Sequence, residues 1–333
     1  KMKSILVTGG AGYVGSGLLS ELLLRGYRVT CIDNLMFGGE SLLNIWHNQN
    51  FTFYNCDIND NEKLNEIFSK NNFDAVIHLA AIVGDPACKL YSNLAIETNL
   101  DSSKRLIDRC KELGISKFIF ASTCSNYGKM DDPEAYVDEN SILAPVSLYA
   151  ELKVKFEKYM LNEMKKDSRF SPTSLRFSTV YGLSPRMRFD LTVNEFTKDL
   201  SLGKELVIFG EKFWRPYCHV KDFSNAFITV LNSPNEKVAY NVFNVGDTKE
   251  NYTKQMLVNE IKKVLPNSQI KYVVKNDDPR DYRVNCDKIK KELGFKISMT
   301  VPDGIMEIKH VIQENIIKDP EDQKYYNIPH ERK

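Results

Sequence analysis

The sequence predicts a doubly wound α/β fold, in which helices cover both faces of a parallel sheet, with a smaller discontinuous α/β lobe. Two observations predict it. Short apolar runs alternate with longer segments of helical periodicity over residues 4–180. These runs are also almost continuously apolar, as in strands that are buried on both faces. The expected strands are residues 4–8, 28–33, 52–57, 75–79, 117–122 and 174–179.

The strand–helix rhythm changes after Gly182. A helix near 222–231 and a strand near 240–245 are expected to rejoin the sheet, and a further strand is expected near 270–274. We therefore predict a first domain of residues 2–180 plus about 220–246, and a second lobe of about 181–219 plus 247–333. Residues 319–333 are polar and aromatic, which indicates a tail rather than core.

Composition narrows the class of protein. The 333 residues include 45 Lys and Arg against 44 Asp and Glu, and this balance indicates neither a nucleic-acid nor a membrane partner. No apolar stretch approaches the roughly 20 residues of a membrane helix. The seven cysteines are odd in number and widely spaced, which argues against a disulfide framework and a zinc site. The first strand leaves no room for a signal peptide, so a cytoplasmic protein without a metal is expected.

The first expected strand runs into a glycine-rich turn, residues 9–15 (Gly-Gly-Ala-Gly-Tyr-Val-Gly), which opens a helical segment. Glycines permit a tight turn and let the backbone approach a pyrophosphate, while the helix directs its positive N-terminus at that charge. A glycine-rich turn without a ligand is the alternative. The position between a strand and a helix favours a dinucleotide-binding (Rossmann) domain.

Two aspartates follow neighbouring expected strands. Asp33 ends the second strand, where a carboxylate accepts hydrogen bonds from the adenosine ribose hydroxyls and repels a 2′-phosphate. Because no arginine adjoins Asp33, NAD is favoured over NADP. Asp57 ends the third strand and is placed to meet the adenine edge. A loop-forming role is the alternative for both residues.

Tyr149 and Lys153 lie four residues apart in a segment that is helical in pattern to about residue 164, so both occupy one helix face. A nearby ammonium favours phenolate over phenol and lowers the pKa of the tyrosine. Such a tyrosine can remove a proton from a sugar hydroxyl while the hydride of the same carbon leaves for nicotinamide, although the Tyr-x-x-x-Lys spacing taken alone is common. Upstream, the fifth strand leads into Thr123, at the edge where α/β sheets bind ligands.

These motifs resemble, in order and spacing, the extended short-chain dehydrogenases/reductases of the nucleotide-sugar epimerase/dehydratase family. The resemblance covers most of the chain. Besides the glycine turn, the strand end at 120–128 and the Tyr-x-x-x-Lys pair, the matching segments are residues 78–81 (His-Leu-Ala-Ala), Asn99, 176–182, 215–222 and 280–283.

The resemblance implies that Thr123 hydrogen-bonds the reacting sugar oxygen, that Tyr149 is the base, and that Lys153 binds the nicotinamide ribose and tunes Tyr149. The implied NAD-binding residues are Gly9, Gly12, Tyr13, Val14, Asp33, Asn34, Asp57, Ile58, Leu79, Ala80, Ala81, Asn99, Tyr149 and Lys153. The implied substrate-binding residues are Val83, Ser125, Thr179, Arg215 and Arg280, with the arginines contacting nucleotide or pyrophosphate. The first domain then binds NAD, the second lobe binds substrate, and helices near 96–113 and 149–164 form a homodimer.

The sequence also departs from the family pattern. Dehydratases of the family carry Asp-Glu directly after the threonine, where this chain has Cys124-Ser125, so dehydration is disfavoured. A packing role is favoured for Cys124 over catalysis, and His219 is interpreted as a structural residue near the junction of the lobes. Thr179 replaces the usual asparagine and Pro216 the usual aspartate. For the loop that begins at Val83, a surface turn is the alternative to a pocket wall.

The expected reaction is hydride removal from C4 of a nucleotide sugar, which gives a 4-keto sugar and NADH. If the ketone leaves, the enzyme is a 4-dehydrogenase; if it takes the hydride back on its other face, the enzyme is a 4-epimerase. The combination of residues 122–128 (Ser-Thr-Cys-Ser-Asn-Tyr-Gly), 83–88 (Val-Gly-Asp-Pro-Ala-Cys) and 184–190 (Ser-Pro-Arg-Met-Arg-Phe-Asp) resembles a branch of bacterial capsule and surface-glycan enzymes. This resemblance favours a 4-dehydrogenase that acts on GDP-manno-heptose, with a 4-epimerase as the alternative. A non-catalytic, NAD-sensing protein on the same fold stays open.

Overall fold

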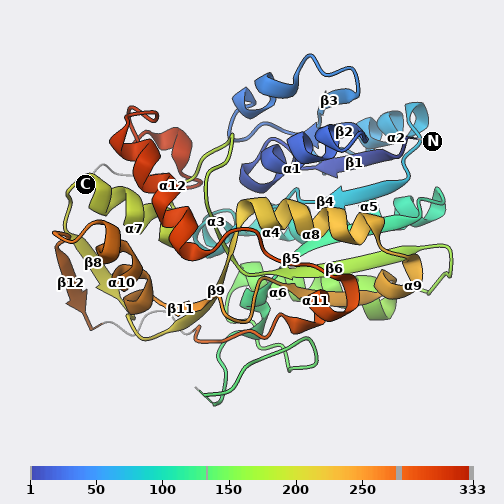
Figure 1. The fold of residues 1–333 in the computed structure, drawn as a ribbon. Helices are drawn as coiled ribbons and strands as arrows, with labels where there is room; N and C mark the ends of the chain where they lie inside the picture. Colours follow the sequence, from blue (N-terminus) through green and yellow to red (C-terminus); the bar gives the residue numbers. More distant parts are fainter. Residues whose placement is uncertain (1, 133, 275–279, 330–333) are drawn as a thin grey trace.

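The computed structural model describes residues 2–132, 134–274 and 280–329, and it confirms the predicted fold class (Figure 1). Seven parallel strands form one sheet in the order β10-β6-β5-β4-β1-β2-β3. They are β1 Ser4–Thr8, β2 Arg28–Asp33, β3 Phe51–Asn55, β4 Ala75–His78, β5 Lys117–Thr123, β6 Ser171–Phe177 and β10 Asn241–Val245. The strand order reverses at β1, which pairs with both β2 and β4, and such sheets bind ligands at the carboxyl ends beside this point.

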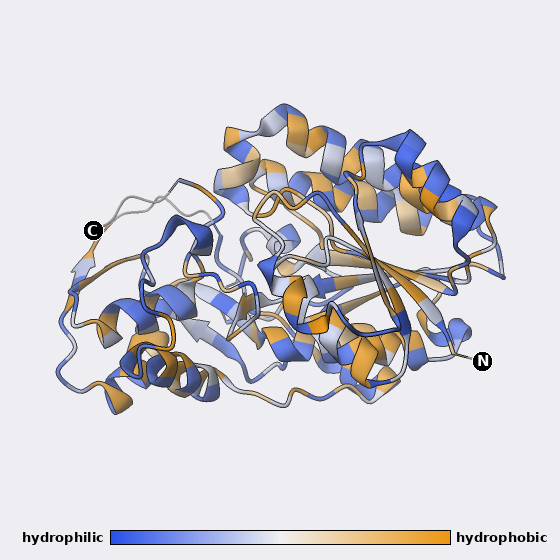
Figure 2. Ribbon diagram, turned by 90° about the horizontal axis from the view of Figure 1, so that it is seen from above, coloured by the Kyte–Doolittle hydropathy of each residue, from blue (hydrophilic) through white to orange (hydrophobic). Residues whose placement is uncertain are grey.

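Helices cover both faces of the seven-stranded sheet. One face packs against α1 (Tyr13–Leu24), α8 (Val220–Asn232) and α11 (Asp287–Leu293), and the other against α2 (Asn61–Lys70), α5 (Ser102–Glu112) and α6 (Leu148–Lys158). Within β1, Ile5 and Val7 face the first layer while Leu6 faces the second, as the alternation of a strand requires. Figure 2 shows these apolar strands in orange between helices on either side. Double burial explains why the strands are continuous apolar runs.

Two smaller sheets are built from the segments between and after the strands of the large sheet. β7 (Thr179–Tyr181) pairs in parallel with β9 (Trp214–His219), which pairs antiparallel with β11 (Asn251–Thr253). β8 (Leu206–Phe209) pairs in parallel with β12 (Ile270–Val273). Further helices are α3 Asp85–Leu90, α4 Ser92–Ile96, α7 Thr192–Ser201, α9 Asn235–Val238, α10 Lys254–Val264 and α12 Val301–Gln313. The division into two lobes at the sequence-derived boundaries stays a prediction.

Several expected element bounds need correction. The sixth strand ends at Phe177 because Ser178 turns its hydroxyl to Val245 O, and Thr179 belongs to β7 in a different sheet. The strand expected from 240 starts at Asn241, since Tyr240 has a φ of 53°, outside the β region. The third strand ends at Asn55, which places Asp57 in the following loop.

The expected C-terminal tail is wrong for residues 319–329. Tyr326 is 5% exposed and packs with Phe189 in an apolar cluster. Its hydroxyl accepts a hydrogen bond from Lys198 Nζ at 2.9 Å, and Phe189 N donates to Tyr325 O at 2.9 Å. This segment is therefore packed onto the fold, because Tyr326 and Tyr325 cover apolar side chains of α12 and of the segment that contains Phe189.

Two observations bear on the predicted class of protein. No helix within the described ranges has both the length and the apolar character that crossing a membrane requires. All seven cysteines are buried free thiols.

His78 joins β4 to its neighbours and generates a prediction about pH. Its Nδ1 lies 2.7 Å from Thr8 Oγ1 and its Nε2 lies 2.8 Å from Ser103 Oγ. Burial lowers the pKa of His78 to about 3, so unfolding takes up a proton at any pH between about 3 and 6.5. The free energy of unfolding should therefore fall as pH decreases through this range, by up to about 1.4 kcal/mol per pH unit from this residue.

Urea unfolding at pH 7 and pH 5 tests this. His78→Asn should lower stability at pH 7, because it disturbs both hydrogen bonds, and should flatten the pH dependence relative to the unaltered chain. His47→Asn, at an exposed position, is the control and should leave both values unchanged. An undiminished pH dependence in His78→Asn would contradict the assignment.

Candidate active site

A pocket of about 550 Å³ runs along the carboxyl ends of β1, β2, β4, β5 and β6. It brings together nearly all of the predicted site residues from segments far apart in the sequence. Those in its lining are Gly9, Gly12, Tyr13, Val14, Asp33, Asn34, Asp57, Ile58, Leu79, Ala80, Ala81, Val83, Thr123, Ser125, Tyr149, Lys153, Thr179 and Arg280. The loop that begins at Val83 is thus a pocket wall rather than a surface turn.

The glycine turn has the shape of a phosphate cradle. Gly9 has a φ of 73°, and a Cβ there would lie 2.7 Å from Ala80 N, so only glycine fits. A Cβ on Gly15 would lie only 2.5 Å from Gly9 O. Because glycine has no Cβ, α1 can begin directly against the turn. Gly12 caps α1 without a side-chain hydrogen bond, and the first turn of α1 has no acidic residue. Backbone N–H groups and the positive end of the helix therefore face the pocket, as binding of a dinucleotide diphosphate requires.

Asp33, at the end of β2, is held by hydrogen bonds in an orientation that suits binding of a ribose. One carboxylate oxygen accepts from Ala11 N at 3.0 Å and the other from Leu35 N at 2.8 Å, so the side chain is fixed with lone pairs to spare. Burial raises the pKa of this carboxyl. Asp57 lies beside it and accepts from Asn34 Nδ2 at 2.9 Å. These contacts place both acids where the adenosine end of a dinucleotide is expected.

Thr123, Tyr149 and Lys153 meet in the same pocket. Lys153 Nζ donates to Ala121 O at 2.8 Å and lies 5.7 Å from the centroid of the Tyr149 ring. The helix that carries both residues, α6, starts at an N-cap, Ser147, whose hydroxyl accepts from Ala150 N. Thr123 ends β5, and its hydroxyl accepts from Ser125 N at 3.1 Å. One helix and one strand end therefore supply the three groups.

The predicted lowering of the tyrosine pKa by its lysine is wrong for the chain alone. Burial raises the pKa of Tyr149, and the negative potential of Cys88 and Asp85 acts in the same direction. Burial also lowers the pKa of Lys153 to about 8, so its positive charge is itself costly in this setting. The effect of desolvation on the pKa of Tyr149 is larger than the effect of the Lys153 charge, because both side chains lie in the same pocket and are desolvated together.

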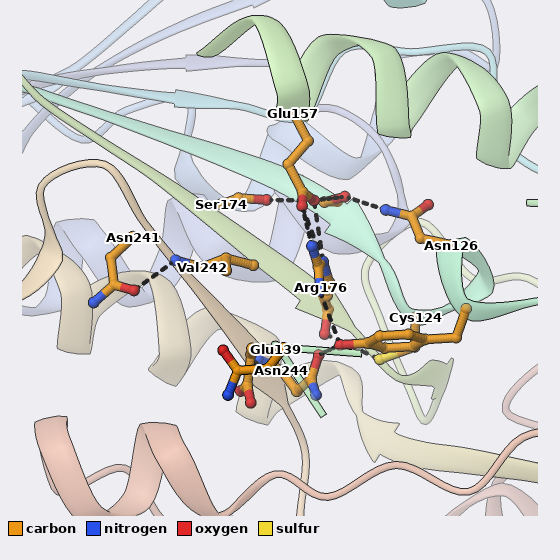
Figure 3. Close-up of polar contacts among 12 residues, drawn as sticks. Cys124, Asn126, Glu139, Glu157, Ser174, Arg176, Asn241, Val242 and Asn244 are labelled. Atoms are coloured by element: carbon orange, nitrogen blue, oxygen red, sulfur yellow. Dashed lines mark hydrogen bonds and ion pairs between the residues drawn. The ribbon is translucent and has the colours of Figure 1, made fainter. Parts of the chain in front are cut away.

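A buried carboxylate links the two elements that carry the catalytic candidates (Figure 3). Glu157 lies on α6, one turn beyond Lys153, and accepts from Ser122 Oγ on β5 at 2.9 Å and from Ser174 Oγ on β6 at 3.0 Å. Arg176 Nε donates to the same carboxylate at 3.0 Å. Since Ser122 precedes Thr123, the Glu157 contacts fix the position of α6 relative to the carboxyl end of β5.

The Glu157–Arg176 pair extends beneath the site through hydrogen-bonded side chains. Arg176 Nη1 donates to Tyr127 OH at 3.0 Å, and Tyr127 OH donates to Asn244 Oδ1 on β10 at 2.6 Å. Both charged side chains are about 5% exposed or less. An ion pair this deeply buried stabilises a protein only if its hydrogen bonds are well satisfied, and here they connect four elements.

Two predicted ligand-binding residues lie outside the pocket. Asn99 is 2% exposed, accepts from Ile82 N and donates to Ile82 O, both at 2.8 Å, so it shapes the loop after β4 instead of reaching the pocket. Arg215 donates to Trp214 O and Arg280 O, and its guanidinium lies 5.1 Å from the Tyr282 ring centroid. Both residues position segments that line the pocket.

Arg280 lines the pocket and forms an ion pair across it. Arg280 Nη1 lies 2.8 Å from Asp85 Oδ2, and the other oxygen of Asp85 accepts from Ser147 Oγ at 2.6 Å. Because Ser147 caps α6, the loop after β4, the catalytic helix and the C-terminal segment meet at Asp85. Tyr282, with its hydroxyl 3.5 Å from Ser125 Oγ, completes this wall.

Cys124 and His219, for which the sequence left a catalytic and a structural role open, both lie where a structural role is expected. Cys124 is 1% exposed, its thiol donates to Arg176 O at 3.2 Å, and burial raises its pKa. His219 is 3% exposed and caps α8, with Nε2 2.6 Å from Glu307 Oε1 and Nδ1 accepting from Lys221 N. Neither belongs to the pocket lining, in line with the interpretation favoured from the sequence.

The pocket also contains residues that the sequence did not single out. Arg186, Arg188 and Asp190 line it, and so do Asn327 and Ile328 from the C-terminal segment. The Pro-Arg-Met-Arg pattern was a recognisable signal, but nothing local in it shows that it crosses the cofactor crevice. Nothing in the sequence signals that Asn327 and Ile328 line the pocket, because their position depends on packing between segments that are far apart in the sequence.

Comparison with known proteins identifies the family. A family model described as the NAD dependent epimerase/dehydratase family matches residues 5–246. The chain belongs to this family. It is therefore an NAD-dependent enzyme of the nucleotide-sugar epimerase/dehydratase type, and the glycine cradle and Asp33 fit that cofactor.

Similar proteins extend the comparison over the whole fold. The chain is 28% identical over 320 residues to a UDP-glucose 4-epimerase of Bacillus subtilis (strain 168), covering 88% of this chain and 92% of the relative. It is 28% identical to a UDP-glucuronate 4-epimerase of Thermodesulfobacterium geofontis (strain OPF15), covering 93% and 96%. A crystal structure of a Thermotoga maritima UDP-glucose 4-epimerase with UDP-glucose has a TM-score of 0.83 at 28% identity, covering 94% and 99%.

The Glu157 contacts generate a prediction about rate. Glu157→Gln leaves Arg176 without a counter-charge in a buried place, so it should lower stability by about 3–5 kcal/mol. The double variant Glu157→Leu/Arg176→Met removes both charges and should recover much of that loss. Both variants should lower kcat by about 100-fold, with little change in KM, because α6 is no longer fixed to the end of β5.

Urea unfolding and steady-state kinetics measure the two effects separately. Glu163→Gln, farther along the same segment and half-exposed, is the control and should change neither quantity. A double variant with native stability and native kcat would show that the pair has no positioning role.

Proposed function

We propose that this enzyme is a nucleotide-sugar 4-epimerase, which oxidises C4 of the sugar with NAD and returns the hydride to the opposite face. The observation that carries the proposal is the convergence of Thr123, Tyr149 and Lys153 on one pocket that also contains the glycine cradle. The relatives named above, UDP-sugar 4-epimerases, support C4 as the reacting carbon and a UDP-sugar as the first substrate to test.

In the proposed reaction, Tyr149 as phenolate accepts the proton of the sugar 4-hydroxyl, and Thr123 hydrogen-bonds the same oxygen. NAD, when bound, accepts the hydride of C4 and later returns it. The C4–H electron pair thus leaves as hydride, and the C4–O bond becomes a carbonyl. After the sugar turns, the hydride re-adds to the other face and Tyr149 returns the proton, so atoms and electrons balance over one cycle.

Burial of Tyr149 gives this reaction a built-in dependence on the cofactor. Because burial raises the pKa of Tyr149, the phenolate requires positive charge nearby. The Lys153 ammonium, 5.7 Å from the centroid of the Tyr149 ring, would supply part of it, and the nicotinamide ring of bound oxidised NAD would supply more. Proton removal from the sugar is therefore expected only with oxidised cofactor in place.

Substrate phosphates are expected beside Arg280. In the chain alone this arginine pairs with Asp85 at 2.8 Å, a contact that a diphosphate would replace on the arginine side. Arg188 also lines the pocket, held by Asp190 through two contacts of 2.8 and 3.1 Å. A nucleotide diphosphate is the class of substrate group that these cations suit.

Release of the ketone is the second candidate function. Residues 184–190, part of the combination that resembles the GDP-manno-heptose 4-dehydrogenases of capsule and surface-glycan biosynthesis, supply Arg186 and Arg188 to the pocket. The same catalytic groups serve both outcomes, so only the products distinguish them. A cytoplasmic homodimer, formed through α5 and α6, is proposed for either enzyme.

Incubation with a panel of UDP-, GDP- and dTDP-sugars, followed by chromatography and mass spectrometry, tests the proposal. The expected product is an epimer of unchanged mass, formed without net NADH. Tyr149→Phe should lower turnover by about 100- to 10,000-fold, since it removes the base.

Tyr159→Phe, on the following turns of the same segment and contacting Asp108 instead of the pocket, is the matched control and should retain activity. A product two mass units lighter with stoichiometric NADH would support the dehydrogenase instead. Unchanged turnover in Tyr149→Phe would contradict both candidates, and NAD binding without turnover of any sugar would favour the sensing alternative.

A further inference from the structure

The segment between β7 and α7 lies directly on the first turn of α1. Ser184 Oγ donates to Tyr13 O at 2.6 Å and lies 3.1 Å from Ser16 Oγ. Arg186 N donates to Ser16 Oγ at 3.4 Å. Residues from the segment between β7 and α7 are thereby held over the end of α1 that faces the pocket.

Arg186 is a buried cation with incomplete hydrogen bonding. It is 7% exposed, and its Nη1 donates to Asn327 Oδ1 at 2.6 Å. Its Nε and Nη2 are buried and find no hydrogen-bond partner within the described residues. A guanidinium carries five N–H donors and cannot shed its charge, so unsatisfied donors in a buried place cost free energy.

Within the described residues Arg186 forms no ion pair with a carboxylate, and the charge of Asp190 only partly opposes the effects of burial and of Arg188 on its pKa. Burial lowers its pKa to about 10, and the neighbouring charge of Arg188 acts in the same direction. Arg188 has its own carboxylate, Asp190, in a two-point contact. The partner of Arg186, Asn327, is a neutral amide. One of the two arginines in this motif is therefore paired with a carboxylate, and the other is held without one.

The place of Arg186 in the pocket indicates which anion it meets. Its guanidinium carbon lies 4.6 Å from the ring centroid of Phe37, in the loop that follows Asp33. Its backbone contacts Ser16 in the first turn of α1. A dinucleotide bound at the glycine turn spans this interval, with its adenosine ribose at Asp33 and its diphosphate at the N-terminus of α1. Phe37 is 41% exposed, so its ring can turn aside to admit the phosphates.

We propose that Arg186 is a cofactor-binding residue that contacts the diphosphate of NAD, with Asn327 of the C-terminal segment holding its guanidinium in place. The contact closes the cofactor crevice from the side of the segment between β7 and α7. The proposal rests on NAD as the cofactor and not on the reaction at C4, so it stands or falls separately from the proposed epimerase activity.

Such a contact suits an enzyme that must keep its cofactor through a reaction cycle. In an epimerase the hydride removed from the sugar has to return from the same nicotinamide, so the reduced cofactor must not leave in between. A charge-assisted contact from a second part of the chain, covered by Asn327 and Ile328, slows that departure. Loss of Arg186 is expected to appear mainly as faster release of cofactor.

The test measures cofactor binding by calorimetry on protein freed of nucleotide, with NAD, ADP and adenosine as separate probes. Arg186→Met should weaken NAD and ADP by about 10- to 100-fold and leave adenosine unchanged, because only the first two carry a diphosphate. Arg186→Lys keeps the charge but loses the planar fork, and should fall between. Asn327→Ala should weaken NAD in the same direction by a smaller factor.

Two controls define the outcomes. Arg25→Met removes an exposed arginine from the far end of α1 and should leave all three affinities unchanged. UDP and GDP binding at saturating NAD tests the substrate diphosphate as the other source of this anion. Native affinity of folded Arg186→Met and Arg186→Lys for NAD and ADP would overturn the proposal. So would an equal loss for adenosine and ADP, or a loss confined to UDP or GDP.

Discussion

One buried carboxylate, Glu157, holds the parts of the active site in register. It receives hydrogen bonds from β5 and β6 while it stands on the helix of Tyr149 and Lys153, and it neutralises Arg176 in the core. A catalytic base on a helix and a hydroxyl on a strand end cannot keep a fixed separation unless the two elements are joined near that end. Apolar packing alone permits small sliding of a helix over a sheet, whereas directed hydrogen bonds to a single carboxylate define one position.

A second constraint is the opposition between burial and charge. Burial raises the pKa of the Tyr149 phenol and lowers that of the Lys153 ammonium to about 8. Both shifts disfavour the charged forms that proton transfer from a sugar requires. Positive charge beside Tyr149 would favour the phenolate, and the nicotinamide ring of bound oxidised NAD would supply such charge.

The sequence predicted most of the cofactor domain because its signals are local. β1 and β2 have the expected bounds, since each apolar run stops at a turn or a polar residue, and the glycine turn and Asp33 lie where their spacing indicated. What escaped prediction depends on long-range packing. Glu157 was not distinguishable from an exposed helical glutamate, Arg186 gave no sign of crossing the crevice, and residues 319–329 were taken for a tail. The pKa of Tyr149 was misjudged because four-residue spacing reports proximity to Lys153 but not the cost of burial.

In the proposed reaction, hydride leaves C4 of a nucleotide sugar and returns to the same carbon from the same bound nicotinamide. A UDP-sugar deuterated at C4 measures this directly. The predicted result is an epimer that retains its deuterium at C4 in ordinary water, together with a primary isotope effect on the transient reduction of enzyme-bound NAD. Loss of deuterium to solvent, or deuterium retained without any reduction of the cofactor, would contradict it.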